Sequence, residues 1–324
     1  MELITRVETD NCGLNVGYGD SILMLGSCFS DNVGERLSRC LMDVCVNPFG
    51  TLYNPASIAR AVERLAENRL FTESELFEHS GMWHSFFHHS RFSSASREKA
   101  LNGINAAYSD AVGRLRSGSV MIVTFGTAYV FRHGGSVVAN CHKLPQREFE
   151  RSRMDVDGIV EEWEMTLALL SRVNPGLKVV FTVSPIRHRA DGMHGNQLSK
   201  AVLLLAVDKL VAGHPQCCYF PSYEIVLDEL RDYRFFAADM AHPTETAVDY
   251  VFERFSETYF TEATRKRTVA CLKLYRMVSH RPLTDNLAEI GKFRQATVDY
   301  ARRLAEELPC VKGQIEKLLR EKGM

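Results

Sequence analysis

Three short apolar runs, each followed by a polar loop, are the feature that most constrains the fold of this chain. The runs at 22–25, 119–125 and 177–183 are rich in Val, Ile, Leu, Met and Phe and have the length of buried strands. Such runs are typical of central strands in parallel sheets. Helical apolar spacing separates them, so the chain is expected to form an α/β domain of βαβ units. The polar loops would then gather at the carboxyl edge of the sheet, where ligands of such folds bind.

The first run, residues 22–25, stops at Gly26 and Ser27. Glycine permits a sharp turn, and Val33 and Leu37 then follow at a helical spacing. Ser27 is therefore expected where the chain leaves the sheet and enters a helix. A hydroxyl beside the positive end of a helix dipole is well placed to be a nucleophile. Serine is also a favoured helix N-cap, so this stretch alone leaves both roles open.

Two neighbours compete with Ser27 as the nucleophile. Ser21, in the triplet Gly19-Asp20-Ser21, would open the strand instead of closing it, and the triplet is interpreted as a turn. Cys28 would share the helix dipole that lowers the pKa of a thiol. Adjacent side chains in a turn point in different directions, however, and a buried cysteine is common packing material. Ser27 is kept as the expected nucleophile, with Cys28 as the alternative.

A serine nucleophile needs a base to accept its proton and an acid to orient that base. Asp239 and His242 supply these residue types three positions apart, so that one loop could carry both. The proline after His242 suits the first turn of a following helix. A second Asp-x-x-His, at Asp191 and His194, is not excluded. The later pair is preferred because a loop at the end of the α/β region could return to the sheet edge.

Further polar residues are expected to contact a substrate. Asn140 follows a predicted hairpin at 128–139, and a long polar loop follows the third apolar run. The candidate substrate contacts are His142, Lys143, Arg187, His188 and Asn196.

Charge and cysteine content limit the binding partners and the cellular compartment that can be expected. The chain has 39 basic and 40 acidic residues, so no strong field favours nucleic acid or an anionic membrane. Its nine cysteines lack paired CxxC spacing, which indicates reduced thiols and a cytoplasmic protein. Residues 1–15 show no apolar signal core, and no apolar run reaches membrane-spanning length. Phosphate-binding glycine motifs are absent from the sequence, and no cofactor is expected.

Three segments are expected in the domain organisation. Residues 1–260 form the α/β domain, with an aromatic and histidine-rich insertion or lid near the site at about 70–95. His84 and His88 lie four apart, but no cysteine or nearby acid completes a metal site, and no metal is expected. Residues 261–324 are charged helices, interpreted as a C-terminal extension that packs on the domain or mediates self-association.

Several sequence blocks resemble one known family. They read GSCFS at 26–30, NPFGTLYNP at 47–55, SPIRH at 184–188 and DMAHP at 239–243. These blocks resemble the GSCFA domain family, named after a Gly-Ser-Cys-Phe-Ala motif in which this chain has Ser30 for the alanine. The resemblance covers roughly residues 14–259. That family is in turn similar to the SGNH hydrolases, including GDSL esterases, which implies a flavodoxin-like three-layer α/β/α sandwich.

The resemblance also implies roles for the triad. Ser27 would be the nucleophile, His242 the base and Asp239 its partner in a serine esterase or acylhydrolase. Relatives of this type act on acetylated sugars, lipids and peptidoglycan, so a small-molecule ester or an O-acetylated carbohydrate is the expected substrate. The alternatives are a carbohydrate- or acyl-binding protein without activity, and an acyl transferase based on Cys28.

The expected oxyanion hole follows from the same resemblance. The backbone amides of Ser27 and Gly50 would supply two donors, although Gly50 also suits a plain turn. The third SGNH donor is an Asn in a Gly-x-Asn-Asp block, where this chain reads Gly-Thr-Ala at 126–128. Asn140 is the expected substitute.

Overall fold

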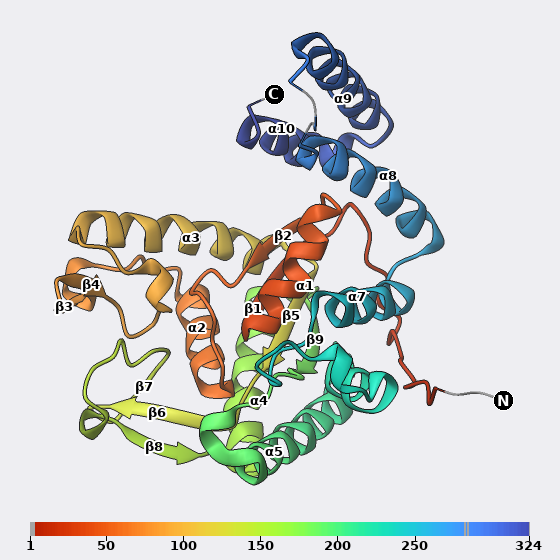
Figure 1. Ribbon diagram of the computed structural model, residues 1–324. Coiled ribbons are helices and arrows are strands. Elements are labelled where there is room, and N and C mark those ends of the chain that lie inside the picture. Colours follow the sequence, from red (N-terminus) through yellow and green to blue (C-terminus); the bar gives the residue numbers. More distant parts are fainter. Residues whose placement is uncertain (1–3, 282, 284, 324) are drawn as a thin grey trace.

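The computed structural model describes residues 4–281, 283 and 285–323, and its centre is a five-stranded parallel sheet (Figure 1). The strands are β1 (Ser21–Gly26), β2 (Asp43–Val46), β5 (Val120–Phe125), β9 (Lys178–Val183) and β10 (Cys217–Tyr219). Their spatial order is β2-β1-β5-β9-β10, and every neighbouring pair is parallel. This is the 2-1-3-4-5 order of flavodoxin-like sheets. The three apolar runs form its central strands, and the predicted α/β fold is confirmed.

Helices cover both faces of this sheet. Successive residues of a strand point to opposite sides, and the central strands are apolar throughout, so both faces must be buried. Leu23 and Leu25 belong to one apolar core, and Ile22 and Met24 belong to the other. The helices of the first core are α2 (Pro55–Glu67), α3 (Arg97–Ser117), α4 (Val156–Val173) and α5 (Gly192–Gly213). The second core contains α1 (Cys28–Arg39), α7 (Glu245–Tyr259) and the C-terminal helices. The domain is therefore a three-layer α/β/α sandwich.

Two small antiparallel sheets lie beside the main sheet (Figure 1). One is the hairpin of β3 (Phe77–His79) and β4 (Met82–His84). The other has the order β7-β6-β8 and contains β6 (Tyr129–His133), β7 (Ser136–Val138) and β8 (Glu150–Arg153). The β6–β7 pair is the predicted hairpin, and β8 adds a third strand to it. This sheet packs on α2 and forms one wall of the cavity described below.

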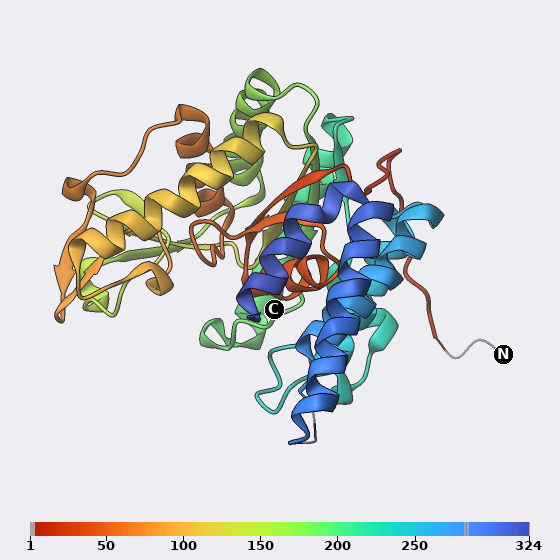
Figure 2. The same ribbon diagram turned by 90° about the horizontal axis from the view of Figure 1, so that it is seen from above.

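The C-terminal extension contains α8 (Glu262–Ser279), α9 (Leu287–Glu307) and α10 (Lys312–Glu321). Figure 1 shows these blue helices at one end of the molecule, and Figure 2, seen from above, shows them grouped together. Leu304 and Ile315 share an apolar core with Leu37 of α1, so the extension packs on the domain. The expected segment limits at residues 1 and 324 lie outside the described residues.

The remaining elements are short. They are α6 (Ser222–Glu224), a π-helical turn (Ile225–Leu230) and 3-10 turns at Glu73–Glu75, Ser90–Phe92, Gln146–Glu148, Arg189–Asp191, Tyr233–Phe235 and Pro309–Val311. Across the described part of the chain, every helix is too short or too polar to cross a bilayer.

Candidate active site

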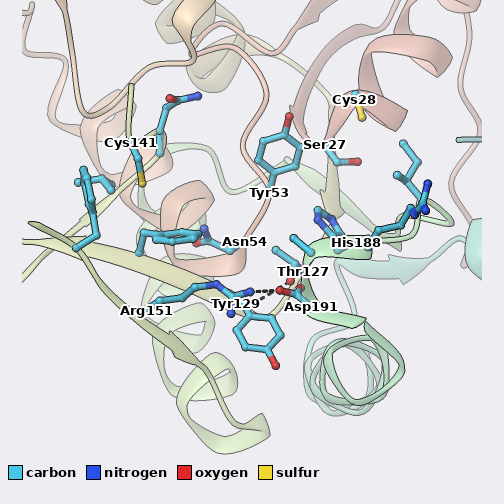
Figure 3. Close-up of a pocket in the computed structure, with 18 of the residues that line it drawn as sticks. Ser27, Cys28, Tyr53, Asn54, Thr127, Tyr129, Cys141, Arg151, His188 and Asp191 are labelled. Carbon is cyan, nitrogen blue, oxygen red and sulfur yellow. Dashed lines mark hydrogen bonds and ion pairs between the residues drawn. The ribbon is translucent and has the colours of Figure 1, made fainter. Parts of the chain in front are cut away.

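A cavity of about 780 Å³ opens at the carboxyl ends of the central strands. Ser27 lines it from the end of β1, Thr127 from the end of β5 and His188 from the loop after β9 (Figure 3). The β6–β8 sheet supplies the facing wall, which includes Tyr129 and Arg151. The expected gathering of strand-end loops is therefore present in the structure.

Ser27 is both the N-cap of α1 and a residue of the cavity wall. Its Oγ accepts a hydrogen bond from the backbone N–H of Phe29 at 3.3 Å, and the residue is 1% exposed. Because the oxygen accepts in this bond, the hydroxyl proton stays available to a base. Gly26 before it has a φ of 153°, and a Cβ there would lie 2.5 Å from the carbonyl oxygen of Thr124. Only glycine fits this turn.

Asp239 and His242 form a hydrogen-bonded pair on one loop. Asp239 Oδ2 lies 2.5 Å from Nδ1 of His242, and Asp239 Oδ1 accepts the backbone N–H groups of His242 and Ala241 at 3.0 and 2.9 Å. These bonds hold the pKa of the Asp239 carboxyl well below its usual range, the His242 amide contributing most. Within the described part of the chain Nε2 of His242 has no hydrogen-bond partner, and His242 lines the same cavity as Ser27.

The alternative Asp-x-x-His pair is not assembled. Arg151 donates a hydrogen bond to the Asp191 carboxylate and forms an ion pair with it, and the Asp191 side chain is 4% exposed. His194 is exposed and does not line the cavity. Asp191 therefore orients Arg151 instead of a histidine.

Gly50 does not stand where the expected oxyanion hole requires it, whereas Asn140 lines the cavity. The N–H of Gly50 donates to the carbonyl oxygen of Asn47 at 2.7 Å, and Gly50 does not line the cavity. This turn uses the amide that was expected to bind an oxyanion. Asn140 lines the cavity, but its Oδ1 accepts the N–H of His142 at 2.7 Å. The next residue, Cys141, lies across the cavity from Ser27 (Figure 3).

His142 and Lys143 are likewise not brought to the cavity. His142 is buried, and its Nε2 lies 2.9 Å from the carbonyl oxygen of Ser85. Its ring lies 4.5 Å from that of His84, and burial lowers its pKa to about 4. His142 is thus a neutral core residue, and Lys143 is an exposed one.

The loop after β9 contains the remaining candidates. Arg187 and His188 line the cavity, whereas Asn196 is buried outside it. Asn196 Oδ1 accepts the backbone N–H of His188 at 3.0 Å, so it holds the loop in place. Burial, followed by the charges of Lys200 and His242, lowers the pKa of His188 to about 4. His188 is therefore neutral near pH 7.

The histidine-rich insertion does not line the cavity. Residues 70–95 are all described, and none of them lines the cavity. His88 is buried against the ring of Phe49 at 5.1 Å, and burial lowers its pKa to about 3. Phe86 stacks on His133, and both rings lie against Phe149 of the cavity wall. The insertion thus supports the wall from behind.

Lys200 is a residue of the site that sequence reasoning missed. Its Nζ is fully buried and donates to the carbonyl oxygens of Gly126 and Ser184, both at 2.6 Å. It thereby ties together the loops that follow β5 and β9. A signal was present, since Lys200 shares a helical face with buried Leu203 and Val207.

The site offers little support for metal chemistry or for a Cys28 nucleophile. Among the described residues, no group of three or more His, Cys, Asp or Glu could hold a metal ion. Burial and the nearby Asp31 raise the pKa of Cys28, which disfavours the thiolate.

A family model described as the GSCFA family matches residues 21–255. The chain belongs to this family, as its sequence blocks predicted. Among solved structures, an acetyl xylan esterase (Est2A) from the rumen bacterium Butyrivibrio proteoclasticus is similar to it, with 11% identity and a TM-score of 0.37. The match covers 74% of this chain and 63% of that one, so this chain spans less than two thirds of its neighbour's length. A search of curated proteins found no match.

Proposed function

We propose that the protein is a serine ester hydrolase of the SGNH type that works through an acyl-enzyme at Ser27. One observation carries the proposal. His242, hydrogen-bonded to Asp239, lines the same strand-end cavity as Ser27, which caps a helix. These are the residue types that serine hydrolysis requires, in a place where ligands of α/β folds bind.

The proposed reaction runs in two halves. Nε2 of His242 takes the hydroxyl proton of Ser27 as Oγ attacks the ester carbonyl, and the imidazolium then gives that proton to the departing alcohol. Water attacks the acyl-enzyme in the second half, again with His242 as base, and releases the carboxylic acid. The ionised Asp239 holds Nδ1–H throughout and stabilises the imidazolium.

The oxyanion is proposed to be bound by the Ser27 amide and by the side chain of His188, in place of Gly50 and Asn140. The Ser27 N–H makes only a long bond, 3.4 Å, to a carbonyl of β5. A Cβ on Gly126 would lie 3.3 Å from Cβ of Ser27 and 3.5 Å from Nε2 of His188. The imidazole thus reaches the neighbourhood of Ser27, and as a neutral ring with Nε2–H it can donate.

The test is turnover of p-nitrophenyl acetate and longer p-nitrophenyl esters by the wild type and by Ser27→Ala. The wild type is expected to show an initial burst and steady turnover, and the variant only the background rate. Equal rates in the two proteins would remove Ser27 from the chemistry.

One observation favours a second candidate, a binding protein that keeps the cavity without hydrolysis. The Gly50 amide is already bonded within its turn, which leaves the expected oxyanion hole incomplete. A fluorophosphonate probe separates the candidates, because it reacts only with an activated serine. Labelling at Ser27 that is lost in His242→Ala supports the hydrolase, and absence of labelling in the folded wild type supports binding alone.

A further inference from the structure

Positive side chains outnumber negative ones in the cavity wall. Of the described residues that line the cavity, Arg151, Arg187 and Arg189 are arginines and Asp191 supplies the single carboxylate. The net charge of the chain is −1, so this excess is a local feature and not a consequence of composition. A wall of one sign raises the local concentration of ligands of the other sign.

The single carboxylate is already engaged. Asp191 pairs with Arg151, whose guanidinium lies 4.0 Å from the centre of the Tyr129 ring. The other two arginines have neutral partners: Arg187 donates to a glutamine side chain at 2.9 Å, and Arg189 to a backbone carbonyl at 3.2 Å. Among the described residues, no carboxylate forms an ion pair with either of them. Two guanidinium groups therefore line the cavity without a direct ion pair, Arg189 being bonded to the backbone carbonyl of Asp239.

Neighbouring titratable groups respond to the same excess of charge. Burial, with a further contribution from Arg187, lowers the pKa of Lys200 to about 7. Burial, followed by Lys200, His242 and Arg151, lowers the pKa of His188. Burial is the main cause of both shifts, and the neighbouring cations lower both pKa values further. A bound anion would relieve this repulsion.

The wall also suits a sugar ring. Tyr53, Tyr129 and Phe149 line the cavity, and flat aromatic faces with a polar rim pack well against the C–H face of a pyranose. The volume of about 780 Å³ exceeds what an acetyl group alone would fill.

We propose that the cavity takes acylated carbohydrates that carry a carboxylate or a phosphate. The acyl group would lie at Ser27, while Arg187 and Arg189 hold the negative charge of the sugar. The planar guanidinium suits both anions, since it presents two parallel N–H donors to two oxygens. This inference rests on the proposed ester hydrolysis and adds the class of its substrate.

The experiment compares three substrates that share the acetyl ester. They are an O-acetylated oligogalacturonate, the same compound with its carboxyl groups methyl-esterified, and an acetylated glucose 6-phosphate. Acetate release gives kcat and KM for the wild type, Arg187→Gln and Arg189→Gln at low salt. Arg172→Gln is the matched control, because Arg172 is an exposed arginine of α4 outside the cavity.

The wild type is expected to prefer an anionic substrate over the methyl ester by about tenfold or more in kcat/KM, chiefly through KM. Each cavity variant should lower that ratio several-fold, roughly threefold to tenfold, and the control should keep it. Whichever anion is preferred identifies the charged group. A wild-type ratio near one, or a ratio that Arg187→Gln and Arg189→Gln leave unchanged, would overturn the proposal while ester hydrolysis stands.

Loss of the proposed function gives a different outcome. If the wild type releases no acetate from any substrate and does not turn over p-nitrophenyl acetate, hydrolysis fails, and calorimetry on the wild type then tests the charge proposal alone. Binding of the free oligogalacturonate in preference to its methyl ester, weakened in Arg187→Gln, would support it. Equal binding of the two, or none, would refute it.

Discussion

The buried lysine beneath the cavity gives a prediction that the structure makes quantitative. Lys200 is fully buried and donates to two backbone carbonyls, and its pKa is lowered from 10.5 to about 7. Below pH 7 the folded and unfolded chains both hold the proton, and the folded chain bears the full cost of a buried ammonium. Between pH 7 and about 10.5 the folded chain releases the proton while the unfolded chain keeps it. Because the unfolded state then binds more protons, stability rises with pH across this window.

Lys200→Met removes this titration and keeps an unbranched side chain of similar reach. One pH unit in this window corresponds to about 1.4 kcal/mol for a single group. The group is still half protonated at pH 7 in the folded chain, so the free energy of unfolding of the wild type should rise, relative to that of Lys200→Met, by roughly 2 kcal/mol between pH 7 and pH 9. Urea unfolding of both proteins at pH 7, 8 and 9 measures this difference, provided that unfolding is two-state.

Lys209→Met is the matched control, because Lys209 lies on the same helix with an exposed side chain paired to Asp157. Its curve should run parallel to that of the wild type. The constant offset of Lys200→Met is a separate quantity, which includes about 1–3 kcal/mol for each carbonyl left without a donor. A wild-type curve parallel to that of Lys200→Met from pH 7 to 9 would refute the reasoning, because the two carbonyls would then hold the proton throughout.

Four further outcomes are expected. Asp239→Asn should lower kcat on p-nitrophenyl acetate by about a thousandfold or more with little change in KM, because Nδ1–H loses its carboxylate acceptor. His188→Ala should lower kcat by about 10²–10³, with partial recovery in His188→Asn, and steady-state assays of both variants check this. Gly126→Ala should lower the melting temperature, because its Cβ would lie 2.9 Å from a backbone carbonyl, whereas Gly103→Ala has open space and should not. Cys28→Ser should retain ester turnover, and a loss comparable to that of Ser27→Ala would make the thiol the nucleophile.

The sequence was informative wherever the determining interactions are local. The apolar runs predicted β1, β5 and β9, because strands buried on both faces carry few polar residues. The pair of Asp239 and His242 could be predicted because they lie three positions apart and one loop holds both. Ser27 was predicted at the end of β1 from Gly26 and the helical spacing after it.

Local patterns could not determine which polar residues reach the cavity. The amide of Gly50 donates to the carbonyl oxygen of Asn47 within a turn, so it does not point to the cavity as an oxyanion donor. A glycine in a turn-rich loop is compatible with both roles. His142 is held away from the cavity by contacts with His84 and Ser85, which lie in the insertion far away in sequence. Such contacts depend on tertiary packing, which spacing along the chain does not encode.

Lys200 is an intermediate case. Its position on the buried face of α5 could have been predicted from the sequence, whereas the two carbonyl groups that it bonds could not. A lysine at the start of an apolar helical face must either reach water or find buried acceptors. Here the acceptors are the carbonyl groups of Gly126 and Ser184, which lie where two adjacent strands end. The same charge that destabilises the core therefore holds together the loops of Thr127 and His188. If Lys200→Met stabilised the protein and left kcat unchanged, this link between a buried cation and the geometry of the cavity would not hold.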